Sequence, residues 1–228
     1  MSGKLYIVAT PIGNLGDMTL RALETLRTVD RIVAEDTRVT AKLLQRYEIK
    51  KPMVSLRARS TRAQFEHVAR MVEEGETLAY VTDAGTPGIS DPGPLLVSLV
   101  RKLCGEAAVL TIPGASALTA ALSVAGVPTD EFTFVGFLPH KKGRQKELDR
   151  LVKEERLIVM YESPHRIKKL LTELETRIQT RTIILGHELT KMHERTAVGT
   201  PTELLARLGQ DIPEKGEFVG MVEPDTLR

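Results

Sequence analysis

The sequence predicts an α/β protein of two domains, the first built on a parallel sheet and the second on a mixed sheet. In the first half, short apolar runs typical of buried strands alternate with helical patterns, and this alternation indicates a parallel sheet with helices on both faces. In the second half, strand-like runs are denser, and a turn-like segment at 199–201 favours antiparallel pairs. We expect the boundary after residue 113, giving domains 1–113 and 114–228.

Local patterns predict the elements of the first half. The apolar run 5–9 is closed by Thr10 and Pro11, which is typical of a buried strand. Thr19 stands where a helix cap is expected, and Gly75 stands at the end of another predicted helix. The other expected strands are 31–34, 53–56, 77–82 and 107–112, and the expected helices are 19–29, 37–47, 60/61–74 and 94–103.

The second half continues with an alanine-rich helix that ends near Gly126 and with an alternating strand at 132–137. A charged helix is expected at 143–155. The remaining expected strands are 157–161, 182–186, 195–198 and 218–223, and the remaining helices are 165–177 and 202–208.

Composition bounds the class of protein. Of 228 residues, 42% are apolar and 27% are charged, which is enough for a packed core. The net charge of +2 does not by itself indicate a nucleic-acid binder. Two basic runs stand out, with eight Lys or Arg against two Glu at 42–70 and seven against four acidic residues at 141–156. They can meet phosphates, although solvated helix faces are the ordinary interpretation.

Cysteine content and the apolar pattern also bear on where in the cell the protein is expected. Cys104 is the only cysteine, so no intrachain disulfide can form. No window has the apolar length of a membrane span, and a strand-like run begins at Lys4 where a signal peptide would stand. We therefore expect a cytoplasmic protein without a membrane partner.

Ligands of parallel α/β sheets bind at the carboxyl ends of the strands, so the loops after residues 9, 34, 81 and 112 are the ones to inspect. None contains the spaced glycines of a dinucleotide fingerprint. Gly88 and Gly93 have the separation of a phosphate-binding P-loop, but Pro94 follows instead of lysine. The histidines are scattered, so no metal site is expected. Asp83 and Asp91 could bind magnesium weakly, but caps of turns and of the next helix are the favoured interpretation.

The segment 81–93, VTDAGTPGISDPG, is instead expected to bind a ligand mainly through its backbone. Its glycines let the main chain approach a ligand closely, and its prolines fix the shape of the loop. A wall built mainly from backbone suits a neutral or cationic small molecule better than a triphosphate.

Seven segments in order closely resemble the 16S rRNA (cytidine-2′-O)-methyltransferase I family, of the tetrapyrrole methylase superfamily. They are LYIVATPIGNLGDMTLRALETL (5–26), AEDTR (34–38), VTDAGTPGISDPG (81–93), IPGASALTAAL (112–122), GFLP (136–139), YESPHR (161–166) and ELTK (188–191). The resemblance implies a two-domain tetrapyrrole-methylase-like fold with the cofactor cleft between the domains. It also implies a homodimer that uses S-adenosylmethionine to methylate the ribose 2′-hydroxyl of a cytidine in the decoding region of 16S rRNA, within the 30S subunit.

The resemblance further implies a set of donor contacts. Other branches of the superfamily carry a Gly-Asp-Pro turn after the fourth strand, where this sequence has Gly85, Thr86 and Pro87. Thr86 thus replaces an aspartate, and Asp83 is expected to compensate. The full set of expected donor-binding residues is Pro11, Asp83, Gly85, Thr86, Ile89, Ser116, Ala117, Met160, Tyr161 and Gly186.

Methyl transfer is an in-line displacement, so alignment matters most, and a base near the weakly acidic 2′-hydroxyl should help. We expect Glu35, Asp36 and Arg38 to form the acceptor-side catalytic cluster, with Lys191 as a base or a phosphate contact. Two structural alternatives stay open. Asp36 could cap the next helix, and Glu162 could pair with Arg166.

Two other functions also stay open. One is a small-molecule methylase of the same superfamily that acts on a tetrapyrrole precursor, which would share the donor site. The other is a non-catalytic ribosome-binding module that has kept the fold. The AEDTR and YESPHR segments and the basic runs favour rRNA as the acceptor.

Overall fold

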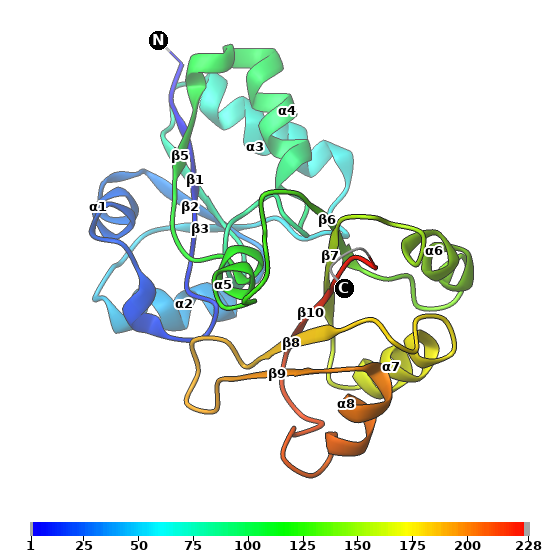
Figure 1. The fold of residues 1–228 in the computed structure, drawn as a ribbon. Coiled ribbons are helices and arrows are strands. Elements are labelled where there is room, and N and C mark those ends of the chain that lie inside the picture. Colours follow the sequence, from blue (N-terminus) through cyan, green and yellow to red (C-terminus); the bar gives the residue numbers. More distant parts are fainter. Residues whose placement is uncertain (1, 226–228) are drawn as a thin grey trace. The chain divides into compact units, whose positions relative to one another are not determined.

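In the computed structural model, which describes residues 2–225, the chain divides into two units, one ending at Ser116 and the other beginning at Ala117. The division lies close to the boundary expected after residue 113. Figure 1 shows the order of the elements, and each unit is described by itself. No helix among residues 2–225 is long and apolar enough to cross a membrane.

The first unit contains a five-stranded sheet in which all neighbouring strands are parallel, as the βα alternation predicts. The strands lie in the order β3-β2-β4-β1-β5. Their bounds are β1 (Leu5–Val8), β2 (Arg31–Ala34), β3 (Met53–Ser55), β4 (Leu78–Val81) and β5 (Val109–Ile112). The helices are η1 (Leu15–Asp17), α1 (Leu20–Thr28), α2 (Thr37–Arg46), α3 (Arg62–Glu73), α4 (Gly93–Cys104) and η2 (Glu106–Ala108).

Helices cover both faces of this sheet, so its central strand β4 is buried throughout (Figure 1). Leu78 and Tyr80 of β4 face the core shared with α3 and α4, whereas Ala79 and Val81 face the core shared with α1 and α2. The helix that follows β4 therefore lies on the opposite face from the helices that follow its neighbours β1 and β2. Chain crossings of this kind leave room for ligands beyond the carboxyl ends of the strands.

Side-chain caps fix the starts of three helices in the first unit. The Thr19 hydroxyl accepts a hydrogen bond from the third N–H of α1, and the Asp36 carboxylate caps α2. Thr61 and Gln64 form a reciprocal capping box at the start of α3. These caps end the preceding loops at fixed residues, so the loops that leave β2 and β3 are short and defined.

The second unit contains a mixed sheet in the order β6-β7-β10-β8-β9, in which only β6 and β7 run parallel to each other. This confirms the predicted antiparallel pairs. The strands are β6 (Phe132–Phe137), β7 (Leu157–Glu162), β8 (Ile183–His187), β9 (Arg195–Gly199) and β10 (Phe218–Val222), and the helices are α5 (Ala117–Ser123), α6 (Arg144–Leu151), α7 (Ile167–Glu175) and α8 (Pro201–Arg207).

The core of the second unit lies between the sheet and helices α6, α7 and α8. Leu148 of α6, Leu171 of α7 and Leu204 of α8 pack against Met160 of β7 and Leu185 of β8. Burial of such side chains stabilises the unit by roughly 1.5–3 kcal/mol each.

Candidate active site

The loops after β1 and β4 are joined where they leave the first sheet. The N–H of Thr10 donates to the carbonyl of Gly85, and the N–H of Gly85 donates to the carbonyl of Thr10, both at 3.0 Å. The Thr10 hydroxyl also donates to the carbonyl of Thr82 at 3.2 Å. These bonds hold the predicted donor residues Pro11 and Gly85 in adjacent, well-fixed backbone.

The loop after β5 is attached to the same structure. The Thr86 hydroxyl donates a 3.0 Å hydrogen bond to the carbonyl of Ala115, immediately before Ser116. Gly85 has a φ of +82°, and a Cβ there would lie 3.3 Å from Cγ2 of Ile12. Gly85 therefore has a left-handed backbone in close contact with Ile12, and the Thr86 hydroxyl links the loop after β4 to the loop after β5.

The glycine-rich segment folds around Asp91. Its carboxylate accepts hydrogen bonds from the N–H groups of Gly88 at 2.6 Å and Gly93 at 2.8 Å. The hydroxyl of Tyr80 lies 3.5 Å from the same carboxylate. These bonds agree with the capping interpretation of Asp91, since they shape the turn and the start of α4. Ile89, at the tip of this segment, is 40% exposed.

Glu35 lies at the end of β2 beside the start of the β4 loop. Its N–H donates to the carbonyl of Val81 at 3.3 Å, and the next N–H, of Asp36, donates to Oδ1 of Asp83 at 3.0 Å. Partial burial raises the pKa of Glu35, and the negative charges of Asp83 and Asp91 raise it further. A carboxylate with a raised pKa is a stronger base, so Glu35 suits proton transfer.

Asp36 and Arg38 form a bidentate pair, with Nε–Oδ1 at 3.0 Å and Nη2–Oδ2 at 2.6 Å. Hydrogen bonds from the Arg38 side chain and backbone hold the pKa of Asp36 well below its usual range. Asp36 therefore stays ionised and caps α2, as the structural alternative anticipates. The Arg38 side chain is 82% exposed, so its guanidinium faces solvent while Asp36 orients it.

Four predicted donor contacts belong to the second unit. Ala117 begins α5. Met160 is 1% exposed, and its side chain is buried in the core beneath the helices. Tyr161 points to the other side of β7 and meets the rings of Phe134 and Phe137 at centroid distances of 5.0 and 5.5 Å. A Cβ on Gly186 would lie 3.3 Å from the Leu189 side chain, so that position is tightly packed.

Lys191 lies in the turn between β8 and β9, where its Nζ contacts Glu188 at 2.8 Å and Glu217 at 2.9 Å. Partial burial acts to lower the pKa of Lys191, but the hydrogen bonds and charges of the two carboxylates outweigh burial and raise it. The amine is therefore held protonated, which favours an anion contact over a base.

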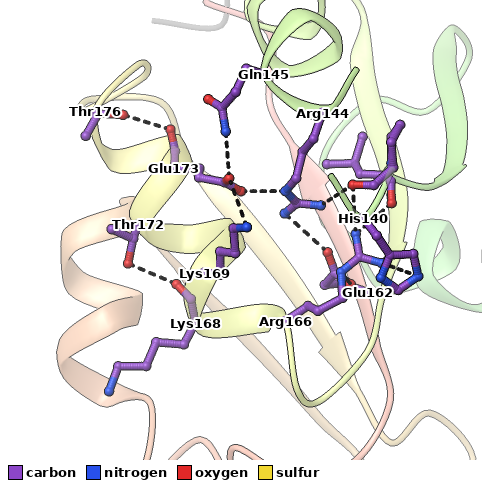
Figure 2. Close-up of polar contacts among 12 residues, drawn as sticks. His140, Arg144, Gln145, Glu162, Arg166, Lys168, Lys169, Thr172, Glu173 and Thr176 are labelled. Carbon is purple, nitrogen blue, oxygen red and sulfur yellow. Dashed lines mark hydrogen bonds and ion pairs between the residues drawn. The ribbon is translucent and has the colours of Figure 1, made fainter. Parts of the chain in front are cut away.

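The YESPHR segment (161–166) contributes to a buried ion-pair network in the second unit. Glu162 is buried and pairs with Arg166 at 3.2 Å, in agreement with the structural alternative, and Figure 2 shows how Arg144 reaches the same carboxylate. The Arg144 Nη2–Glu162 Oε2 distance is 3.6 Å, and Arg144 Nε lies 2.8 Å from Glu173. Arg166 also donates to the carbonyl of Leu138 at 2.6 Å. This network fixes the GFLP loop and the end of β7.

Sequence reasoning assigns no role to Arg144 or Tyr80. Arg144 belongs to a basic run whose ordinary interpretation is a solvated helix face, and nothing in that run distinguishes it from its neighbours. Tyr80 does carry a signal, because its hydroxyl is a polar group within the otherwise apolar strand Leu78–Val81. A buried tyrosine at the carboxyl end of a central strand needs a polar partner, and Asp91 provides it.

The structure brings Glu35, Asp36, Arg38 and Asp83 together at one edge of the first sheet, next to the joined loops that carry the predicted donor contacts of that unit. The far edge is different. A hollow of about 660 Å³ between α2 and β3 contains none of the predicted site residues. Among residues 2–225, no group of three or more His, Cys, Asp or Glu side chains could hold a metal ion.

Comparisons with known proteins point to methyl transfer. Residues 4–205 match the family described as Tetrapyrrole (Corrin/Porphyrin) Methylases. The chain is 50% identical to the ribosomal RNA small subunit methyltransferase I of Synechocystis over 95% of this chain and 77% of that protein. The Thermotoga maritima protein of the same name is 44% identical over 92% of this chain and 94% of its own length.

Solved structures are similar in fold. The methyltransferase CobJ superposes with a TM-score of 0.70 at 18% identity, covering 100% of this chain and 96% of its own. The uroporphyrin-III C-methyltransferase of Thermus thermophilus, complexed with S-adenosylhomocysteine, gives a TM-score of 0.65 at 17% identity, covering 97% of each chain. At such identities the likeness concerns the fold alone.

Proposed function

The chain belongs to the tetrapyrrole (corrin/porphyrin) methylase family and, within it, to the ribosomal RNA small subunit methyltransferases I, and we propose that it methylates the ribose 2′-oxygen of a cytidine in the decoding region of 16S rRNA. It is an rRNA methyltransferase that uses S-adenosylmethionine as the methyl donor. The observation that carries this function is identity of 41–50% to relatives of that name over nearly the whole chain.

The first unit fits the donor. When bound, S-adenosylmethionine supplies a methyl group on a positively charged sulfur. The β1 and β4 loops offer backbone at close range, where a Cβ on Gly85 would already crowd Ile12. Asp83, exposed at the strand end, adds a negative charge suited to a cation. We assign the donor contacts of this unit to Pro11, Asp83, Gly85, Thr86, Ile89 and Ser116.

The second unit completes the proposed donor set. Ala117, Tyr161 and Gly186 would contribute contacts there, and Met160 would contribute its backbone because its side chain is buried in the core. The network around Glu162 supports this assignment, since it fixes the end of β7 immediately after Tyr161.

On the acceptor side, Glu35 is the proposed base. With S-adenosylmethionine bound, the Glu35 carboxylate would accept the proton of the ribose 2′-hydroxyl as that oxygen takes the methyl group. The bound donor would supply this methyl from its sulfur, which would keep the electron pair of the carbon–sulfur bond. The raised pKa of Glu35 supports this role because a carboxylate with a higher pKa accepts a proton from the weakly acidic hydroxyl more readily. Asp36 orients Arg38, whose exposed guanidinium would contact a phosphate or the ribose.

Of the two roles expected for Lys191, we favour the phosphate contact because two carboxylates keep its amine protonated. We further propose that the acceptor is rRNA within the 30S subunit, that the enzyme works as a homodimer, and that it acts in the cytoplasm, where 30S subunits are found. Sedimentation of the purified chain tests the dimer, which predicts twice the mass of one chain.

The function is tested by incubating the protein with methyl-labelled S-adenosylmethionine and either undermethylated 30S subunits or a free tetrapyrrole precursor. Label should enter 16S rRNA and not the tetrapyrrole. Label in the tetrapyrrole would instead support a small-molecule methylase. Donor binding by calorimetry without transfer to either acceptor would support a ribosome-binding module.

A further inference from the structure

The basic run 42–70 is divided by the fold between two opposite edges of the first sheet. Arg46 and Lys50 precede β3, and the hydrogen bond from Ile32 N–H to the carbonyl of Pro52 places this part of the chain toward the start of β2. Arg57 and Arg59 follow β3, and the Leu56 N–H donates to the carbonyl of Ala34, at the end of β2. Only the second group shares an edge with Glu35.

The loop that carries Arg57 and Arg59 is a defined turn. The N–H of Ser60 donates to the carbonyl of Arg57 at 2.9 Å, and the Ser60 hydroxyl accepts a bond from the Arg57 N–H at 3.0 Å. The Thr61 capping box starts α3 directly afterwards. Both arginine side chains are exposed, so a rigid turn presents two guanidinium groups to solvent.

The charges on this turn are available. Among residues 2–225, neither Arg57 nor Arg59 takes part in an ion pair. Arg57 nevertheless lies close enough for its charge to lower the pKa of Asp36. By contrast, all three arginines of the other basic run, 141–156, are paired with carboxylates. Arg38, another arginine at this edge, pairs with Asp36 but keeps an 82% exposed side chain.

An RNA strand that approaches this edge meets carboxylates. Glu35, Asp83 and Asp91 are near enough for their charges to interact, and they repel phosphates. An acceptor strand therefore needs cationic contacts beside them. Arginine suits this purpose because its planar fork binds phosphate through two hydrogen bonds.

We propose that Arg57 and Arg59 form an arginine rim that binds backbone phosphates of the single-stranded RNA next to the acceptor ribose. This rests on the proposed function, and it names the surface that positions the substrate. The rim acts through phosphates and therefore contributes affinity without base specificity. Its loss should affect RNA binding and leave the donor site intact.

The test compares Arg57→Glu/Arg59→Glu with Arg46→Glu/Lys50→Glu, which carries the same change of charge at the opposite edge. Methyl transfer to undermethylated 30S subunits gives KM, filter binding of a single-stranded decoding-region RNA at graded salt gives affinity, and calorimetry gives donor affinity. The rim variant should raise KM at least about tenfold. It should also make the negative slope of log affinity against log salt shallower by about 1.4. The control should stay near wild type, and donor affinity should not change in either variant.

Wild-type KM and salt slope in the rim variant, or an equal loss in the control, would overturn the proposal. A larger loss in Lys141→Glu/Lys142→Glu would place the contact on the second unit and overturn it as well. Failure of the proposed function is a separate result. In that case wild-type protein labels no 30S rRNA, while filter binding still reports whether the rim holds RNA.

Discussion

The backbone N–H of Asp36 donates a 3.0 Å hydrogen bond to Oδ1 of Asp83, which joins the loops after β2 and β4. This bond places the Asp83 charge beside Glu35, where it helps to raise the pKa of the Glu35 carboxyl. The proposed base and the proposed donor contact are thereby coupled through one backbone group.

Replacing Asp83 by Asn keeps the acceptor for the Asp36 N–H but removes the charge. The pKa of Glu35 should then fall, because a neighbouring negative charge no longer disfavours its ionised form. A base must be deprotonated to act, so the acid limb of the pH profile of methyl transfer should move to lower pH. An unmoved acid limb at saturating donor would show that Glu35 does not control it.

Replacing Glu35 by Gln removes the proposed base with little change in shape. Methyl transfer to 30S subunits should fall by roughly a hundredfold or more, while calorimetric affinity for S-adenosylmethionine stays near wild type. Arg38→Ala should also reduce transfer more than donor binding. Wild-type turnover in either variant would remove that residue from the mechanism.

Gly85→Ala tests the close-approach turn, and Gly88→Ala is its matched control. Both glycines have positive φ values, +82° and +95°, so both variants should lose roughly 1–2 kcal/mol of stability. Only a Cβ at Gly85 meets a neighbour, 3.3 Å away on Ile12, whereas none lies within 4 Å at Gly88. Donor affinity should fall about tenfold in the first variant alone. Equal affinities in the two variants would contradict the assigned pocket wall.

Glu162→Gln tests the buried network of the second unit. It leaves Arg144, 2% exposed, without one of its two carboxylate partners. We expect the free energy of unfolding to drop by about 3 kcal/mol, measured by urea denaturation. Glu147→Gln breaks the exposed pair with Arg150 and should cost about 0.5 kcal/mol. Similar losses in both variants would argue against a structural role for the network.

Much of the fold follows from local sequence signals. The apolar run 5–9, the cap at Thr19 and the βα alternation lead to the observed strands, helix start and parallel sheet. Because the carboxyl ends of parallel strands share one edge of a sheet, the positions of Glu35 and Asp83 after two such strands also predict that they lie on the same side. The family resemblance is confirmed by relatives that are named ribosomal RNA small subunit methyltransferase I.

Other features depend on contacts between distant residues. The charged helix expected at 143–155 ends at Leu151, since helix propensity does not fix boundaries. From the sequence, Arg144 is expected on a solvated helix face like the other cations of its run. Only the packing of α6 against α7 shows that it pairs with Glu173. Lys50 and Arg57 lie at opposite edges of the sheet because one precedes and the other follows β3, which runs parallel to β2. A count of charges along the sequence does not predict this separation.

The central claim is that the methyl group goes to a ribose oxygen of rRNA. A 2′-O-methyl group blocks alkaline cleavage of the adjacent phosphodiester bond, because the attacking hydroxyl is gone. After labelling of 30S subunits with wild-type protein and alkaline hydrolysis of the 16S rRNA, the account predicts label in an alkali-resistant dinucleotide that begins with cytidine. Label in mononucleotides would mean base methylation and would contradict it.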